Sequence, residues 1–227
     1  THELKTKGFA VTHKRVARIM RDEGLVGVPA RRFSGSTTDS KHHLGFAENH
    51  LGRDFIAAAP NEKWVGDITY LPIKGGWVYL SVLIDLYSRK VIGWALDDHM
   101  RTQLCLDALR QAIALRKPGA GLIHHTDRGS QYASSKYSQS LTEIGAIASM
   151  SRKGNCWDNA VAESFFGTLK QELVKGTAWN SMAAARVDIA EYIHKFYNAE
   201  RSHSANGWLS PVAVEAAYRS SAERLAA

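Results

Sequence analysis

The chain has 227 residues, and its 44% hydrophobic and 9% aromatic content is enough for a packed core, which excludes a largely disordered polypeptide. Lys and Arg outnumber Asp and Glu by 29 to 22, so the formal net charge is +7, which favours a polyanionic partner without identifying one. Two cysteines outside any CxxC pair and the lack of an apolar run near ~18 residues argue against a disulfide framework, a zinc knuckle and a membrane span, and favour the cytoplasm.

A short basic helix is predicted over residues 12–27, THKRVARIMRDEGLVG, with Thr12 as its cap and Gly24 as its stop. With LKTKGF before it, this helix can form the end of a helix-turn-helix unit. The basic side chains that would then face DNA are Lys14, Arg15 and Arg18. An ordinary amphipathic surface helix explains the pattern equally well. Residues 28–60 are polar and rich in Gly, Ser and His, so we expect residues 1–58 to be a basic helical segment followed by a linker.

From Trp64 onward the sequence becomes rich in β-forming residues. The runs WVGDITYLPI, GWVYLSVLIDLYS and KVIGWALDD are separated by short turn signals, which predicts three antiparallel strands. The elements expected next are a helix ended by Pro118-Gly119, a short strand over 121–125, a helix near 134–144, the strand AIASMS, a helix over 158–174 and another over 181–197. This order predicts a mixed sheet with helices on both faces.

Asp127 lies in HHTDRGSQY, directly after a short apolar run, where either a turn or a catalytic site explains an aspartate. Phosphoryl transfer needs several carboxylates, because Mg²⁺ prefers oxygen ligands and two ions about 3.5–4 Å apart can hold the attacking and leaving oxygens. Asp67 is unusual because it lies inside WVGDITY, and Asp is depleted in strands. A sheet-edge position is the plain alternative for Asp67. Asp85, at a strand end beside a turn, is the weaker candidate.

The helix expected over residues 158–174 has one apolar stripe at ~100° per residue. The stripe is formed by Val161, Phe165, Phe166, Leu169 and Leu173. Glu163 and Lys170 fall together at its margin, two turns apart, so both can face a site at the sheet edge. On helical position alone, a solvated Glu and Lys at the helix flank is the favoured interpretation.

The interval between Asp127 and Glu163 is 35 residues. With an upstream Asp, it resembles the D,D-35-E carboxylate triad of the DDE superfamily of transposases and retroviral integrases. Longer stretches are similar to the integrase-like product of the second reading frame in the insertion-sequence-three family. These stretches are WVGDITYLP, HHTDRGSQYAS, SMSRKGNCWDNAVAESFFGTLKQEL and FYNAERSHSANGWLSPVA, and HKRVARIMRDEGLVG resembles the segment that precedes the core.

This resemblance implies a DNA transposase or integrase that cleaves and transfers strands during transposition of an insertion sequence. It implies an α/β, ribonuclease-H-like mixed five-stranded sheet flanked by helices, with a small basic helical N-terminal segment and a helical C-terminal tail. The catalytic core would span residues 59–178 and the C-terminal extension residues 179–227. Asp67, Asp127 and Glu163 would be the catalytic residues and would bind two Mg²⁺ or Mn²⁺ ions.

The implied partners are double-stranded DNA at the element ends and the target, further copies of the chain on that DNA, and an upstream-frame DNA-binding protein as a fusion. The bacterial nucleoid would be the place of action, with no membrane partner.

The core residues expected to contact DNA are Lys170, Arg128, Arg152 and Lys153. Lys170 matches the family's basic position near the scissile phosphate, whereas Arg128 suits a turn as well as a phosphate. His124 and His125 are interpreted as strand-end or DNA-facing residues, because Mg²⁺ favours oxygen. For Trp157 we favour packing under its loop over stacking on a base.

Two other functions remain open. A ribonuclease-H-like nuclease could share the fold and the metals, although the basic N-terminal helix and the long similar stretches are not expected of one. A catalytically silent DNA-binding remnant of a transposase is the second, and the complete carboxylate triad argues against it.

Overall fold

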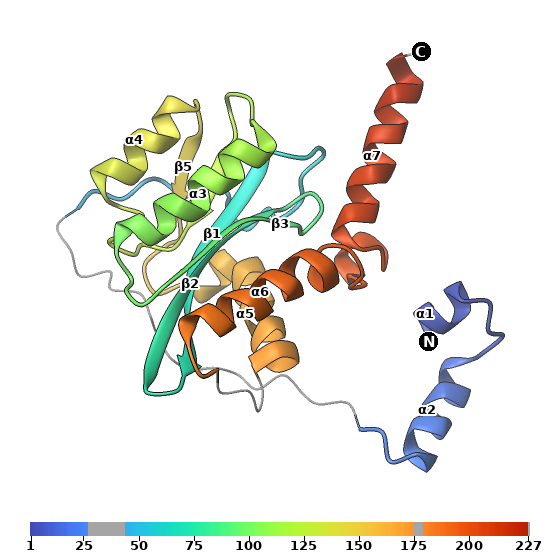
Figure 1. Cartoon of the computed structure of the whole chain (residues 1–227). Helices are drawn as coiled ribbons and strands as arrows, with labels where there is room; N and C mark the ends of the chain where they lie inside the picture. Colours follow the sequence, from blue (N-terminus) through green and yellow to red (C-terminus); the bar gives the residue numbers. More distant parts are fainter. Residues whose placement is uncertain (27–43, 175–178, 227) are drawn as a thin grey trace. The chain divides into compact units, whose positions relative to one another are not determined.

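The computed structural model describes residues 1–26, 44–174 and 179–226 (Figure 1). The chain divides into two units, Thr1–Arg32 and Phe33–Ala227. None of the described helices is long and apolar enough to cross a membrane.

The first unit contains the helices α1 (His2–Thr6) and α2 (His13–Asp22). The cap expected at Thr12 is present, because its side-chain oxygen accepts a hydrogen bond from the Arg15 backbone N–H at 3.2 Å. The basic side chains of α2 that were expected to face DNA are exposed: Lys14, Arg15 and Arg18.

The second unit is built on one five-stranded sheet with the order β3-β2-β1-β4-β5. Its strands are β1 (Lys63–Ile73), β2 (Gly76–Asp85), β3 (Val91–Asp97), β4 (Ile123–Thr126) and β5 (Ile147–Met150). The first three strands pair antiparallel through short turns, whereas β4 pairs parallel with both β1 and β5. The expected mixed sheet of five strands is confirmed.

Helices cover both faces of this sheet (Figure 1). On one face, α3 (Thr102–Arg116) and α4 (Ser135–Glu143) bury a core that includes Trp64 and Ile68 of β1. On the other, α5 (Ala160–Leu169) and α6 (Met182–Glu191) pack against a core that includes Val65 of β1. Because side chains alternate along a strand, Asp67 shares the face of Val65 and points to the side that carries α5.

Glycine permits the close packing of α3 on β3. A Cβ at Gly93 would clash with the backbone oxygen of Ala108 and approach the Ala112 side chain to 2.9 Å. The helix therefore lies closer to the strand than any side chain at this position would allow.

The expected domain boundaries differ from the packing. Leu51 is 2% exposed and belongs to the core, although it lies in the segment interpreted as a linker. Trp179 and α6 complete the same core, and the Lys74 N–H donates to the Trp179 carbonyl at 2.8 Å. Residues 44–58 and the segment after 178 are therefore parts of the core unit, because its α5 face needs their apolar side chains. Residues 28–43 of the expected linker lie outside the described residues.

The two long C-terminal helices of the prediction are interrupted in the structure. The expected helix over 158–174 consists of a 3₁₀ turn η1 (Cys156–Asn159), α5 and a π-helical segment η2 (Lys170–Val174). Similarly, α6 continues into the π-helical segment η3 (Tyr192–Tyr197), and η4 (Ser204–Asn206) and α7 (Pro211–Ala226) follow. The apolar stripe of α5 is confirmed, since Phe165, Phe166 and Leu169 are buried.

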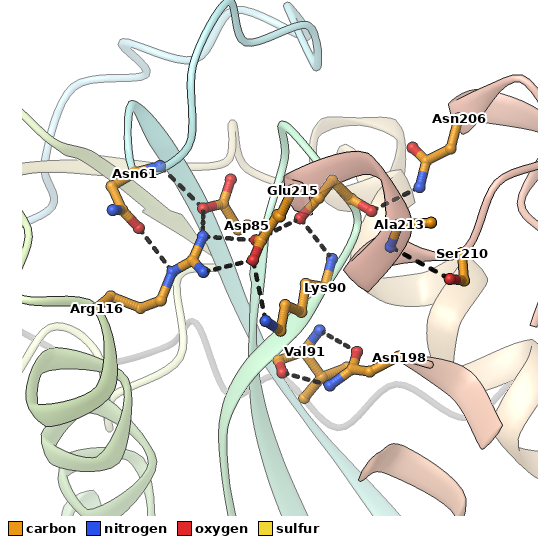
Figure 2. Close-up of polar contacts among 11 residues, drawn as sticks. Asn61, Asp85, Lys90, Val91, Arg116, Asn198, Asn206, Ser210, Ala213 and Glu215 are labelled. Carbon is orange, nitrogen blue, oxygen red and sulfur yellow. Dashed lines mark hydrogen bonds and ion pairs between the residues drawn. The ribbon is translucent and has the colours of Figure 1, made fainter. Parts of the chain in front are cut away.

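A buried ionic network joins the start of α7 to the sheet (Figure 2). Arg116 at the end of α3 contacts Asp85 of β2 at 2.6 Å and Glu215 of α7 at 2.7 Å. Lys90 and Ser88 also contact Glu215, at 3.0 and 2.9 Å. Asp85, the weaker metal candidate of the sequence, therefore has a structural partner in Arg116.

Candidate active site

The parallel register of β1 and β4 brings Asp67 and Asp127 to neighbouring positions. Lys63 pairs with Ile123 and Val65 pairs with His125, where the ladder ends; Asp67 and Asp127 each follow two residues later, and the charge of Asp127 raises the pKa of Asp67. The Ile68 backbone N–H donates to Asp67 Oδ1 at 2.8 Å. Two aspartates separated by 59 residues of sequence thus meet on one face of the sheet.

Helix α5 supplies the third carboxylate. Its buried face packs against β1, and the side-chain amide of Asn159 donates to the Gly66 carbonyl at 3.3 Å. Glu163 follows on the first turn of α5 and is more than a third exposed. Lys170 begins η2, and its ammonium nitrogen lies 5.0 Å from the centre of the Tyr70 ring of β1.

Burial and the neighbouring carboxylates Asp127 and Glu163 raise the pKa of Asp67 well above its ordinary value. Desolvation also raises the pKa of Glu163. Burial lowers the pKa of the Lys170 ammonium, although Asp67 acts in the opposite sense. Asp67 therefore lies within electrostatic reach of Asp127, Glu163 and Lys170, and the two other carboxylates oppose its ionisation.

Such a set of oxygen donors suits a hard divalent cation, whose charge would relieve the repulsion. Among the described residues, a group of three potential ligands with atoms within 4.8 Å of one another occurs elsewhere, at Asp97, Asp98 and His99 after β3. The carboxylate oxygens of Asp67, Asp127 and Glu163 are therefore not all within 4.8 Å of one another. Exposed acidic groups such as Asp98 often lie close together without an ion.

The sequence is similar to known integrase core domains and transposases. Residues 57–156 and 145–211 match the family described as Integrase core domain, and residues 1–33 match HTH-like domain. The chain is 45% identical over 215 residues to Transposase InsF for insertion sequence IS3A of Escherichia coli strain K12, covering 95% of this chain and 74% of that protein. The chain belongs to the IS3 family of transposases. It is also 42% identical over 216 residues to the transposase of insertion sequence element IS904 from Lactococcus lactis, covering 93% of this chain and 83% of that protein.

Solved structures place the fold of this transposase among retroviral integrases. The catalytic core domain of HTLV-2 integrase in complex with magnesium matches with a TM-score of 0.53 and 20% identity, over 70% of this chain and 98% of that one. A chain of the simian T-cell lymphotropic virus intasome matches with a TM-score of 0.60 and 18% identity, over 91% of this chain and 67% of that one. At these identities the likeness establishes the fold, and the predicted ribonuclease-H-like architecture is confirmed.

The turn after Asp127 holds its carboxylate in place. The Gly129 backbone N–H donates to Asp127 Oδ1 at 2.9 Å. A Cβ on Gly129 would lie 3.0 Å from that oxygen and 2.8 Å from Gln131 Oε1, so a side chain here would press on both. Gln131 in turn donates to the Met100 carbonyl at 2.9 Å, which links the turn to the loop before α3.

We expect Gly129→Ala to lower the strand-transfer rate of the transposase by roughly 10-fold to 100-fold, because small displacements of a catalytic group are costly. The loss should appear in the rate at saturating DNA while the affinity for DNA changes little. Gly119→Ala is the control, since a Cβ at Gly119 meets nothing within 4 Å. Equal rates for the two variants would show that the turn does not position Asp127.

The two histidines before Asp127 are core residues. His124 is 1% exposed and its Nε2 lies 2.7 Å from the Tyr137 hydroxyl, while His125 is fully buried between the hydroxyls of Ser149 and Ser151 at 2.8 and 3.1 Å. Burial lowers the pKa of His124 to about 3 and that of His125 to about 4, so both are neutral at physiological pH. They are strand-end residues as predicted, but they do not face DNA.

Arg128 crosses from the Asp127 turn to the next loop. Its Nε donates to the Ser151 carbonyl at 2.7 Å, and its guanidinium carbon lies 4.7 Å from the centre of the Phe46 ring. These contacts favour the structural interpretation of Arg128.

The basic loop before α5 is organised by Asp158, which sequence reasoning missed. Asp158 is fully buried and accepts from the guanidinium groups of Arg152 at 2.8 Å and Arg53 at 2.7 Å. Arg152 leads the interactions that hold the pKa of Asp158 far below its usual range. Lys153 is exposed and Trp157 is 68% exposed, so the preference for packing of Trp157 was wrong.

Two polar residues near the C-terminus, Arg201 and His203, have structural contacts. Arg201 contacts Glu172 of η2 at 3.0 Å, and the Tyr192 hydroxyl donates to the same carboxylate at 2.6 Å. His203 is 8% exposed and packs edge-on against Tyr197 at 4.7 Å. No spacing rule in the sequence could have paired these side chains, because their partners lie in other helical segments.

Proposed function

We propose that this transposase cleaves and joins DNA strands by metal-dependent phosphoryl transfer at Asp67, Asp127 and Glu163. The observation that carries the proposal is the arrangement of three segments around one point: Asp67 in β1, Asp127 just after the neighbouring parallel strand β4, and Glu163 on the first turn of α5, whose start is bonded to β1. The donor set contains only carboxylate oxygens, which fits Mg²⁺ or Mn²⁺. Two such ions, when bound, would supply Lewis-acid stabilisation of the attacking and leaving oxygens.

The chain's own groups would bind and orient the reacting strand. Asp67, flanked by both other carboxylates, is suited to hold a ligand shared between them. Glu163 is the most accessible of the three and lies where DNA can approach. Lys170 follows on the same side, and a phosphate beside its half-buried ammonium would favour the charged form of that group. Lys170 is therefore proposed to fix the phosphate next to the scissile bond.

DNA binding beyond the active site is proposed for the exposed Lys153 of the loop before α5 and for the basic face of α2, Lys14, Arg15 and Arg18. Arg128 and Arg152 have internal partners at their guanidinium groups, so their contribution to DNA binding would come through the shape of their loops.

Transposition acts on two element ends, so a homo-oligomer on DNA is part of the proposal, as is fusion with an upstream-frame DNA-binding protein. The described core unit would form the catalytic body of that assembly, in the bacterial nucleoid.

The test is a strand-transfer assay with the full chain, a labelled duplex carrying the element end with a free 3′-hydroxyl, and an unlabelled target duplex. We expect joined products with Mg²⁺ or Mn²⁺ and none with EDTA. Cleavage without joining would favour a ribonuclease-H-like nuclease. Binding to DNA without either product, when the upstream-frame protein is also supplied, would favour a silent remnant and contradict the proposal.

A further inference from the structure

We infer that Asn159 is a positioning residue for the active site: it holds β1 next to Asp67 and thereby strengthens the binding of the divalent cation. The inference rests on the proposed function.

The side chain of Asn159 does not cap helix α5, although its position favours capping. It is the N-cap residue of α5, where an Asn side chain usually accepts a hydrogen bond from a backbone N–H of the first turn. Here the side chain makes no such bond. Its Nδ2 donates instead to the carbonyl oxygen of Gly66 at 3.3 Å. The side chain is therefore directed toward β1, 93 residues away in sequence, and not along its own helix.

The contact between Asn159 and Gly66 lies at the end of the β1–β4 pairing. Val65 is the last β1 residue paired with β4, and Gly66 and Asp67 continue beyond the end of that ladder. The bond from Asn159 thus anchors the backbone of the residue that immediately precedes the central carboxylate. It also ties the start of α5 to β1, and Glu163 lies one turn further along that helix.

The other end of the same amide has no partner among the described residues. Asn159 is 4% exposed, and its Oδ1 is buried without any hydrogen-bond donor in reach. A buried acceptor left unsatisfied costs about 1–3 kcal/mol, so such an atom calls for an explanation. The same amide contacts the carbonyl of Gly66, the residue directly before Asp67, so its oxygen lies at the entrance to the carboxylate cluster's own strand segment.

Water bound to the divalent cation would supply a hydrogen-bond donor for Asn159 Oδ1. Water bound to a divalent ion is a strong hydrogen-bond donor, and groups that accept from it orient the ligands around the ion. The amide of Asn159 contacts the residue before Asp67, and its oxygen is suited to this use because it adds an acceptor without adding a fourth negative charge to the three carboxylates. Asn159 would then act through Asp67 and the bound water, not on the DNA itself.

The experiment measures the dissociation constant of the full chain for Mn²⁺ by calorimetry, and Tm with and without the ion. We expect Asn159→Leu to weaken Mn²⁺ binding about 10-fold to 100-fold, as outer groups of metal sites do. Its ion-free Tm should stay within a few degrees of the wild type, because the substitution removes an unsatisfied acceptor together with one hydrogen bond. Asn159→Ala removes the same amide without adding bulk and should weaken Mn²⁺ binding to a similar extent.

Asn155→Leu is the matched control in the same loop. Its amide oxygen accepts from Arg53 at 2.8 Å, so the change removes a polar contact but should leave Mn²⁺ binding unchanged. Unchanged Mn²⁺ affinity in Asn159→Leu, with a lowered ion-free Tm, would overturn the inference and leave Asn159 a purely structural residue. If Asn159→Leu does not fold, unchanged Mn²⁺ affinity in folded Asn159→Ala would overturn it. A wild-type chain that binds no Mn²⁺ would instead overturn the proposed function.

Discussion

Asp67→Asn is expected to raise the Tm of the ion-free transposase by about 2–4 °C, which corresponds to roughly 1 kcal/mol for a chain of this size, while it lowers strand transfer at least about 10³-fold. Burial and the charges of Asp127 and Glu163 raise the pKa of Asp67 well above its ordinary value, so the charged carboxylate opposes folding. Asparagine removes that charge at nearly the same volume. It also removes the residue proposed to be shared between the other two carboxylates.

The sign of the pH dependence follows from the direction of this shift. A raised pKa means that the folded state binds the Asp67 proton more tightly than the unfolded state, so the destabilisation is present above the raised pKa and fades as the pH falls through it. With EDTA, the Tm advantage of Asp67→Asn over the wild type should therefore be largest above the raised pKa of Asp67 and should shrink in acid.

Scanning calorimetry with EDTA and with Mg²⁺ checks both parts. Mg²⁺ should raise the Tm of the wild type and leave that of Asp67→Asn nearly unchanged, because only a folded state that binds the ion gains stability. Asp107→Asn is the control, since this carboxylate is 47% exposed and paired on the helix surface with Arg110. A lower ion-free Tm for Asp67→Asn than for the wild type would contradict the electrostatic account of the site.

Arg116→Met should produce the largest loss of stability, about 3–5 kcal/mol, because it leaves buried carboxylates without their main cation. Asp85 is fully buried and the Glu215 side chain is 4% exposed, and Arg116 contacts both. Methionine approximates the length of the arginine stem but offers no donors. At 2–4 °C per kcal/mol, a Tm decrease of roughly 6 °C or more is expected.

Arg110→Met, six residues earlier on the same helix, is the control. Arg110 is 62% exposed and pairs with Asp107 at the surface, where such a pair contributes about 0–1 kcal/mol. Although burial pushes the pKa of Glu215 upward, its bonds to Arg116 and Lys90 hold it below its ordinary value of 4.5. The wild type therefore loses the stabilisation that ionised Glu215 supplies as the pH falls below about 4.5. The difference in Tm between the wild type and Arg116→Met should narrow in that range.

Similar Tm values for Arg116→Met and Arg110→Met would show that the network contributes little to stability.

The three carboxylates proposed to be catalytic each leave a local trace in the sequence. Asp67 interrupts a β run, Glu163 lies beside an apolar helical stripe, and the interval of 35 residues links Glu163 to Asp127. The alternation of buried residues and the turn signals likewise predicted the five strands in their correct order along the chain.

Contacts between distant segments left no such trace. The bond from Asn159 to Gly66 and the pairing of Asp158 with Arg53 join residues 93 and 105 positions apart, and periodicity carries no information about them. The core role of Leu51 was missed for a related reason, because a single apolar residue in a polar segment has no period. The π-helical segment η2 that follows α5 has no signature in the apolar spacing, so helical periodicity alone predicted a regular helix to residue 174.

Strand transfer by Glu163→Gln tests the central claim most directly, because Glu163 is exposed and the substitution conserves its size. The variant should unfold within about 1 °C of the wild type and bind the element end as tightly, since surface changes of this kind alter stability by less than about 0.5 kcal/mol. We predict that joined products fall at least about 10³-fold with Mg²⁺. Joined products at the wild-type level would contradict the assignment of Asp67, Asp127 and Glu163 as the catalytic triad.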